Sequence, residues 1–86
     1  MKIRQIDKIL YAMLHNPEKK EWSAKDFQSG EYFIGYEASA RMSEIQRIYP
    51  DKIIVGKDGR FRTLSINWDN IDENFKKQID GYIGTN

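Results

Sequence analysis

The chain has 86 residues, a formal net charge of +1, 40% hydrophobic residues and 31% charged residues. This size and composition predict one domain with a single modest core and a well-solvated surface. The absence of cysteine excludes both a disulfide scaffold and a zinc site with cysteine ligands. No apolar run approaches the roughly 20 residues that span a bilayer, and no signal peptide is visible, so we expect a soluble, cytoplasmic protein without a membrane partner.

The first predicted element is an amphipathic helix that ends near Asn16-Pro17. Proline disfavours helical geometry in the residue before it, which ends the helix there. The apolar residues recur at helical spacing and form one stripe: Ile3, Ile6, Ile9, Leu10, Met13 and Leu14. A charged loop follows, and Trp22 beyond it is predicted to lie in a short extended segment.

A short second helix is predicted over residues 24–28. Ser23 offers an N-cap, and Asp26 three residues later gives a weak form of the capping box. Ser29-Gly30 ends this helix, and residues 31–35 form a connector. Three aromatic residues are assigned to the core: Trp22, Phe33 and Phe61.

The third predicted helix covers residues 36–49, with Pro50 as its limit. At 100° per residue, its core face consists of Ala38, Met42, Ile45 and Tyr49. The opposite face consists of Tyr36, Ala40, Ser43 and Arg47. Arg41 falls on the flank of the core face, a position that favours a partly packed guanidinium paired with a nearby acid.

A β-hairpin is predicted after Pro50. Its strands are residues 53–55 and 60–66, and Asp58-Gly59 is a strong turn signal, which places the turn at residues 57–59. Alternation with a period of two puts four side chains on one face of the second strand: Arg60, Arg62, Leu64 and Ile66. The last two reach the core, whereas the two arginines lie nearer the turn and beyond the core.

A fourth helix is predicted over residues 68–83, capped by Asn67 or Asp69. Its apolar residues recur every three or four positions: Trp68, Ile71, Phe75, Ile79 and Tyr82. This stripe either folds back on the first helix or pairs with a second copy of the chain in a homodimer. Asp72 and Glu73 are adjacent, so they indicate a capped, solvated helix start rather than a pair of catalytic carboxylates.

The element order is helix, short strand, helix, helix, hairpin and helix, so the predicted fold class is mainly α with a small β-hairpin, that is α+β. Three segments resemble small phage-type winged helix-turn-helix proteins: residues 22–27, residues 35–45 and residues 58–62. The most specific stretch reads Ala40-Arg41-Met42-Ser43-Glu44-Ile45. The resemblance implies a winged helix-turn-helix domain over residues 1–67, with a three-helix core and a wing, followed by a C-terminal helix over residues 68–83.

The resemblance also implies double-stranded DNA as the partner, bound sequence-specifically or architecturally. The protein would be a small transcriptional regulator or an accessory protein of a phage or mobile element. In such domains the third helix enters the major groove and the hairpin contacts flanking phosphates. The residues expected at the DNA are Tyr36, Ser39, Ala40, Arg41, Ser43, Arg47, Lys57, Arg60 and Arg62. For Tyr36, packing over the turn is favoured over a phosphate contact, and the exposed serines and arginines are alternatively ordinary solvated side chains.

Charge is distributed unevenly along the chain. Residues 41–62 hold six basic and three acidic side chains, a net charge of +3, whereas residues 69–86 hold two basic and four acidic ones, a net charge of −2. A basic middle beside an acidic end favours an anionic partner for one face. The near-neutral total, with Glu37 and Glu44 beside the exposed face of the third helix, favours the alternative of a protein-protein interaction adaptor. RNA binding is a weaker third alternative, since no RNA-recognition signature is present.

Catalysis and cofactor binding are not expected. His15 is the single histidine and has no cluster of acids beside it in the sequence, which argues against a metal site. The chain has no supporting Ser-His-Asp spacing, no cysteine nucleophile and no glycine motif that holds phosphate. We therefore expect a binding protein without metal or cofactor, and not an enzyme.

Overall fold

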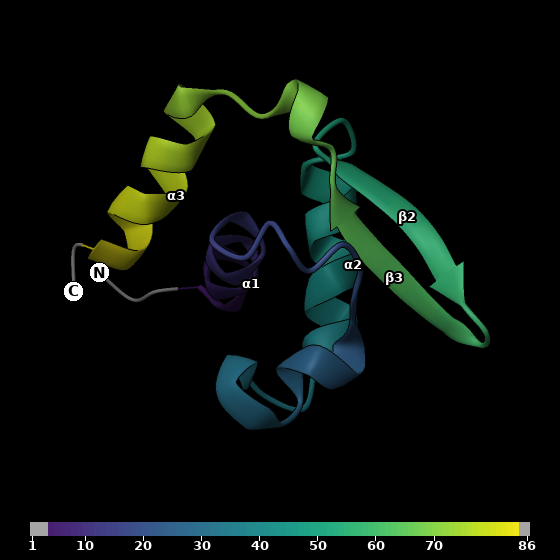
Figure 1. Cartoon of the computed structure of the whole chain (residues 1–86). Coiled ribbons are helices and arrows are strands. Elements are labelled where there is room, and N and C mark those ends of the chain that lie inside the picture. The colour runs from purple at the N-terminus through teal and green to yellow at the C-terminus, as the bar shows by residue number, and fades with distance from the viewer. Residues whose placement is uncertain (1–3, 85–86) are drawn as a thin grey trace.

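Within residues 4–84, which the computed structural model describes, the chain forms three α-helices and one three-stranded antiparallel sheet (Figure 1). The predicted α+β class is confirmed at this level. The helices are α1 (Gln5–Leu14), α2 (Ala38–Ile48) and α3 (Glu73–Gly84). The strands are β1 (Trp22–Ser23), β2 (Ile53–Asp58) and β3 (Phe61–Ile66), and they lie in the order β1-β3-β2.

The core lies around α1, which packs between α2 and α3 (Figure 1). The predicted apolar stripes supply most of it: Ile6, Ile9, Leu10, Met13, Leu14, Ala38, Met42, Ile45, Leu64, Ile66, Phe75 and Ile79. Ile3, which the sequence pattern adds to the first stripe, lies outside the described residues. Burial of these side chains is the main favourable contribution to folding.

Trp22 lies in a short extended segment, as predicted, and its strand joins the sheet by pairing with Leu64 of β3. The indole is 1% exposed and stacks on Phe27, with 5.3 Å between ring centroids. Tyr32 meets the same indole edge-on at 4.9 Å. This aromatic cluster attaches β1 and the loop that follows it to the core.

The predicted second helix is a single 3₁₀ turn, η1 (Ala24–Phe27), and another such turn, η2 (Gly30–Tyr32), follows it. The prediction of a helix over residues 24–28 is therefore only partly right, because the segment is not α-helical. The capping contact is present, since the Ser23 backbone N–H donates to Oδ2 of Asp26 at 2.8 Å. A four-residue segment makes too few i to i−4 hydrogen bonds to offset the cost of nucleating an α-helix.

α2 begins at Ala38 rather than at Tyr36. Gly35 holds a φ of +148°, and Glu37 has the non-helical torsions φ −97° and ψ 26°. A Cβ added at Gly35 would lie 3.1 Å from Nε2 of Gln5, so this turn passes close to α1. Tyr36 therefore precedes the helix and is not part of its exposed face.

The β2–β3 hairpin turns later than predicted. Asp58 pairs with Phe61, so Gly59 and Arg60 form a two-residue turn, and Arg60 belongs to the turn rather than to the strand. Gly59 has a φ of +63°, which glycine adopts without strain. The pairing of β3 with β1 ends at Thr63, so residues 57–62 project past the rest of the sheet (Figure 1). We call residues 57–62 the overhang.

The predicted fourth helix divides into a 3₁₀ turn, η3 (Trp68–Asn70), and α3. Oδ1 of Asp72 accepts the Phe75 backbone N–H at 2.8 Å, so Asp72 caps α3. The predicted α-helix caps at Asn67 or Asp69 are wrong, because the α-helix starts later. Asp72 and Glu73 are both exposed, and the prediction of a capped, solvated helix start there is confirmed.

α3 packs against α1 within the single chain. Phe75 and Ile79 are buried there at 5% and 0% exposure, and Ile71 and Tyr82 are partly buried against the same core. Trp68 precedes α3 and is 39% exposed. Phe75 and Ile79 of the predicted stripe are thus buried in the core of the single chain.

Two glycines test how the backbone conformation affects stability. Gly81 lies inside α3 and Gly59 lies in the hairpin turn, and an added Cβ at either would meet nothing within 4 Å among the described residues. We expect Gly81→Ala to raise the free energy of unfolding by about 0.5–1 kcal/mol, since alanine loses less backbone entropy in a helix. We expect Gly59→Ala to lower it by about 1 kcal/mol, because φ is positive there. Urea unfolding followed by circular dichroism measures both, and changes of the same sign would contradict these assignments.

Candidate functional site

One side of α2 faces solvent and carries mostly small side chains. Ser39, Ala40, Ser43 and Arg47 are all exposed there, as predicted, and Ser39, Ser43 and Arg47 follow one another at successive helical turns. Because the first three side chains are short, the helix's own side chains leave room on this face for another group to approach. Arg47 makes no hydrogen bond or ion pair within residues 4–84, so its guanidinium is available.

Arg62 holds the hairpin beside this face of α2. Its Nη1 donates to Oγ of Ser43 at 2.9 Å, and its Nη2 donates to the backbone oxygen of Ser39 at 2.9 Å. Ser43 Oγ in turn donates to the same Ser39 oxygen at 3.2 Å. The strand β3 and the exposed face of α2 therefore form one continuous surface.

The overhang brings two further cations to this surface. Lys57 pairs with Arg62 in the β2–β3 register, and Arg60 occupies the turn. Both side chains are exposed, and neither makes a hydrogen bond or ion pair within the described part of the chain. The predicted residues of the hairpin and of α2 thus come together, although they are separated in sequence.

Arg41 behaves differently from the other predicted arginines. Its Nε lies 3.4 Å from Oε1 of Glu44, and the two side chains are 36% and 31% exposed. The prediction of a partly packed guanidinium paired with a nearby acid is confirmed. This pair forms one wall of a shallow depression of about 430 Å³, whose lining residues are Ala40, Arg41, Ser43, Glu44 and Arg47.

Two aromatic residues assigned to the core are exposed instead. Phe33 is 50% exposed, Phe61 is 48% exposed, and Tyr36, which was expected to cover the turn, is 81% exposed. Phe33 and Tyr36 contact each other edge-on at 5.6 Å. Only Trp22 of the three predicted core aromatics is buried, because it alone lies between the sheet and the η1 turn.

Lys25 is a residue that the sequence reasoning missed. It lies on η1, and its Nζ is 3.9 Å from the centre of the Phe61 ring on the overhang. This cation–π contact adds a positive charge beside the turn end of the hairpin, because Phe61 directly follows the Gly59–Arg60 turn. No sequence signal identifies it, because the pairing of β1 with β3 alone brings the two residues together.

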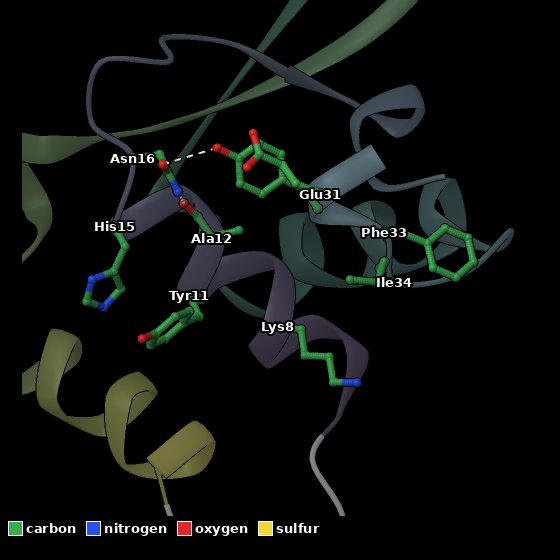
Figure 2. Close-up of a pocket in the computed structure, with 9 residues that line it drawn as sticks. Lys8, Tyr11, Ala12, His15, Asn16, Glu31, Phe33 and Ile34 are labelled. Carbon is green, nitrogen blue, oxygen red and sulfur yellow. Dashed lines mark hydrogen bonds between the residues drawn. The ribbon is translucent and has the colours of Figure 1, made fainter. Parts of the chain in front are cut away.

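A second hollow lies between α1 and the η2 segment (Figure 2). It has a volume of about 290 Å³ and is lined by Lys8, Tyr11, Ala12, His15, Asn16, Glu31, Tyr32, Phe33 and Ile34. The Tyr32 hydroxyl donates to Oδ1 of Asn16 at 3.2 Å. Partial burial, with the nearby carboxylates of Glu31 and Glu18, raises the pKa of Tyr32 above its ordinary value.

The described residues contain no arrangement typical of a metal centre. Within residues 4–84, no three or more histidine or acidic side chains gather so that they could hold a metal ion. His15 instead contacts a single acid, with its Nε2 2.8 Å from Oδ1 of Asp80. In the same range the longest helix, α3, has 12 residues, and none of the helices is long and apolar enough to cross a membrane.

Comparisons of the chain with protein-family models, curated proteins and solved structures found no match. The functional assignment therefore depends on the geometry of the chain itself. The surface formed by the exposed face of α2 and the overhang is the best candidate site, because it combines available cations with an accessible helix.

Proposed function

We propose that the chain is a winged helix-turn-helix domain that binds double-stranded DNA. In this proposal α2 enters the major groove and the β2–β3 hairpin is the wing. The observation that carries the proposal is the pair of hydrogen bonds from Arg62, which join the basic hairpin to the exposed face of α2. A helix and a flanking basic loop on one surface are what a groove and its bordering phosphates require.

The dimensions and side chains of α2 suit a groove. The helix has 11 residues, so it is about 16 Å long. The major groove is about 12 Å wide and admits one helix. The short side chain of Ala40 leaves room on this face for base edges, and Arg47 is long enough to reach a guanine or a phosphate.

The charges of the surface suit the bordering phosphates. Lys57 and Arg60 on the overhang are free of other partners within residues 4–84, and Lys25 lies against Phe61, next to the hairpin turn. The Arg41–Glu44 pair places one acid and one base together, so it contributes little net charge. We infer a modest, salt-dependent affinity for any duplex, on the order of micromolar or weaker for one copy.

Fluorescence anisotropy of a labelled duplex, at about 50 and about 200 mM salt, tests the proposal. We expect binding at the lower concentration and a marked loss at the higher one. Absence of binding at tens of micromolar protein at the lower salt concentration would overturn it. A small transcriptional regulator and an accessory protein of a phage or mobile element both fit such a domain.

A protein-protein interaction adaptor is the second candidate function. The exposed aromatic pair Phe33 and Tyr36 favours it, because exposed aromatic side chains are enriched at protein interfaces. These two residues lie outside the surface formed by α2 and the overhang. Failure of duplex binding, with the fold intact, would leave this candidate as the better proposal.

A homodimer through the C-terminal stripe was the other proposed partner. Its interface would need Phe75 and Ile79, which are already buried in the core of the single chain. We therefore propose that one copy is the binding unit. Sedimentation at tens of micromolar decides the matter, since a dimeric mass would overturn the proposal of a single-copy unit.

A further inference from the structure

We propose that Arg62 is a positioning residue that fixes the wing against α2, and that it is not one of the phosphate contacts. The inference rests on the proposed function and deepens it, because it divides the cations of one surface into two roles. Arg60 and Lys57 contact phosphate, whereas Arg62 sets the position from which they do so.

The hydrogen bonds of Arg62 use its guanidinium from within the protein. Both terminal nitrogens donate at 2.9 Å, one to Ser43 Oγ and one to the Ser39 backbone oxygen. Because Ser43 Oγ also donates to that backbone oxygen, the three groups form a closed set. Arg62 is half-buried, while Lys57 and Arg60 are exposed. These bonds use one N–H of each terminal nitrogen and hold the guanidinium against α2, whereas the Arg60 guanidinium has no partner within residues 4–84 and can turn toward a phosphate.

The position of Arg62 on the hairpin explains why hydrogen bonds between the hairpin and α2 are needed. Pairing between β3 and β1 ends at Thr63, so Arg62 is the residue of the overhang that lies next to this pairing. Within residues 4–84, the hydrogen bonds that join the overhang to α2 are the two from Arg62. Without them, the angle between the wing and α2 would vary. DNA binding would then have to order the wing, which lowers the affinity.

Lysine substitutions at positions 60 and 62 separate the two roles, because lysine keeps the charge but cannot donate from two nitrogens held in one plane. We expect Arg62→Lys to weaken duplex binding about three- to tenfold, close to the effect of Arg62→Ala, whereas Arg60→Lys stays within about twofold of the wild type. We expect Arg60→Ala to lower the slope of log K against log salt by about 0.9, and Arg62→Ala to leave it nearly unchanged. The inference would be overturned if Arg62→Lys bound the duplex with the affinity of the wild type. It would also be overturned if the two alanine variants lowered the slope of log K against log salt by the same amount.

Ser43→Ala provides an independent arm of the experiment, because it removes one of the two acceptors of Arg62 and changes no charge. We expect Ser43→Ala to weaken binding about threefold, and the double variant with Arg62→Ala to bind no more weakly than Arg62→Ala alone. Fully additive losses would contradict a shared role of Arg62 and Ser43 in positioning the wing.

A nuclear magnetic resonance measurement without DNA separates this inference from the proposed function. Slow rotation of the Arg62 guanidinium in the wild type, and faster rotation in Ser43→Ala, would support the positioning role even if the wild type binds no duplex. Free rotation in the wild type would overturn it.

Discussion

Replacing Arg47, Lys57 and Arg60 together with alanine is expected to lower duplex affinity by more than about a hundredfold at 50 mM salt. These three side chains are exposed and have no other partner within residues 4–84. With Lys25 they allow about four phosphate contacts, for which a rise from about 50 to about 200 mM salt weakens wild-type binding roughly a hundredfold. The triple variant should lose most of this salt dependence, because about three fewer counterions are released from the DNA when the variant binds.

A matched control changes the net charge by the same amount at another place. Lys8, Lys20 and Lys77 are exposed and lie outside the surface formed by α2 and the overhang. Their combined replacement by alanine should change affinity by only a few-fold, through long-range electrostatics. Anisotropy titrations of both variants at the two salt concentrations make the comparison. Similar losses in the two would mean that net charge alone explains binding, and the site assignment would be wrong.

Trp22→Ala is expected to lower the free energy of unfolding by about 3–5 kcal/mol, because it leaves a large cavity beside Phe27 and Tyr32. The total free energy of unfolding of a domain this small is about 4–13 kcal/mol, so the variant should lose a large share of its stability. A drop in Tm of at least about 12 °C follows, since 1 kcal/mol corresponds to roughly 4–8 °C at this size. Thermal unfolding followed by circular dichroism measures it.

The second tryptophan supplies the control. Trp68 is 39% exposed, so Trp68→Ala should cost about 1 kcal/mol or less. Equal destabilisation by the two substitutions would contradict the placement of Trp22 at the centre of the aromatic cluster. A small effect of Trp22→Ala would show in addition that β1 contributes little to the sheet.

Elements that depend on neighbouring residues alone could be predicted from the amino-acid sequence. The apolar spacing from Ile6 to Leu14 and the proline at position 17 define α1, and the core face Ala38, Met42 and Ile45 defines α2. Side chains at helical spacing lie on one face whatever the rest of the chain does, which is why these faces were predictable. The Arg41–Glu44 pair was predictable for the same reason, since the two residues lie one helical turn apart.

Features that depend on contacts between distant segments could not be predicted from the amino-acid sequence. The pairing of β1 with β3 brings Lys25 to Phe61, and the packing of the hairpin on α2 brings Arg62 to Ser43. The sequence assigned Arg62 to DNA because its spacing only shows that it lies near a turn. A side chain's partner is set by the neighbours it meets in three dimensions, and a guanidinium that finds two acceptors within the protein is held there.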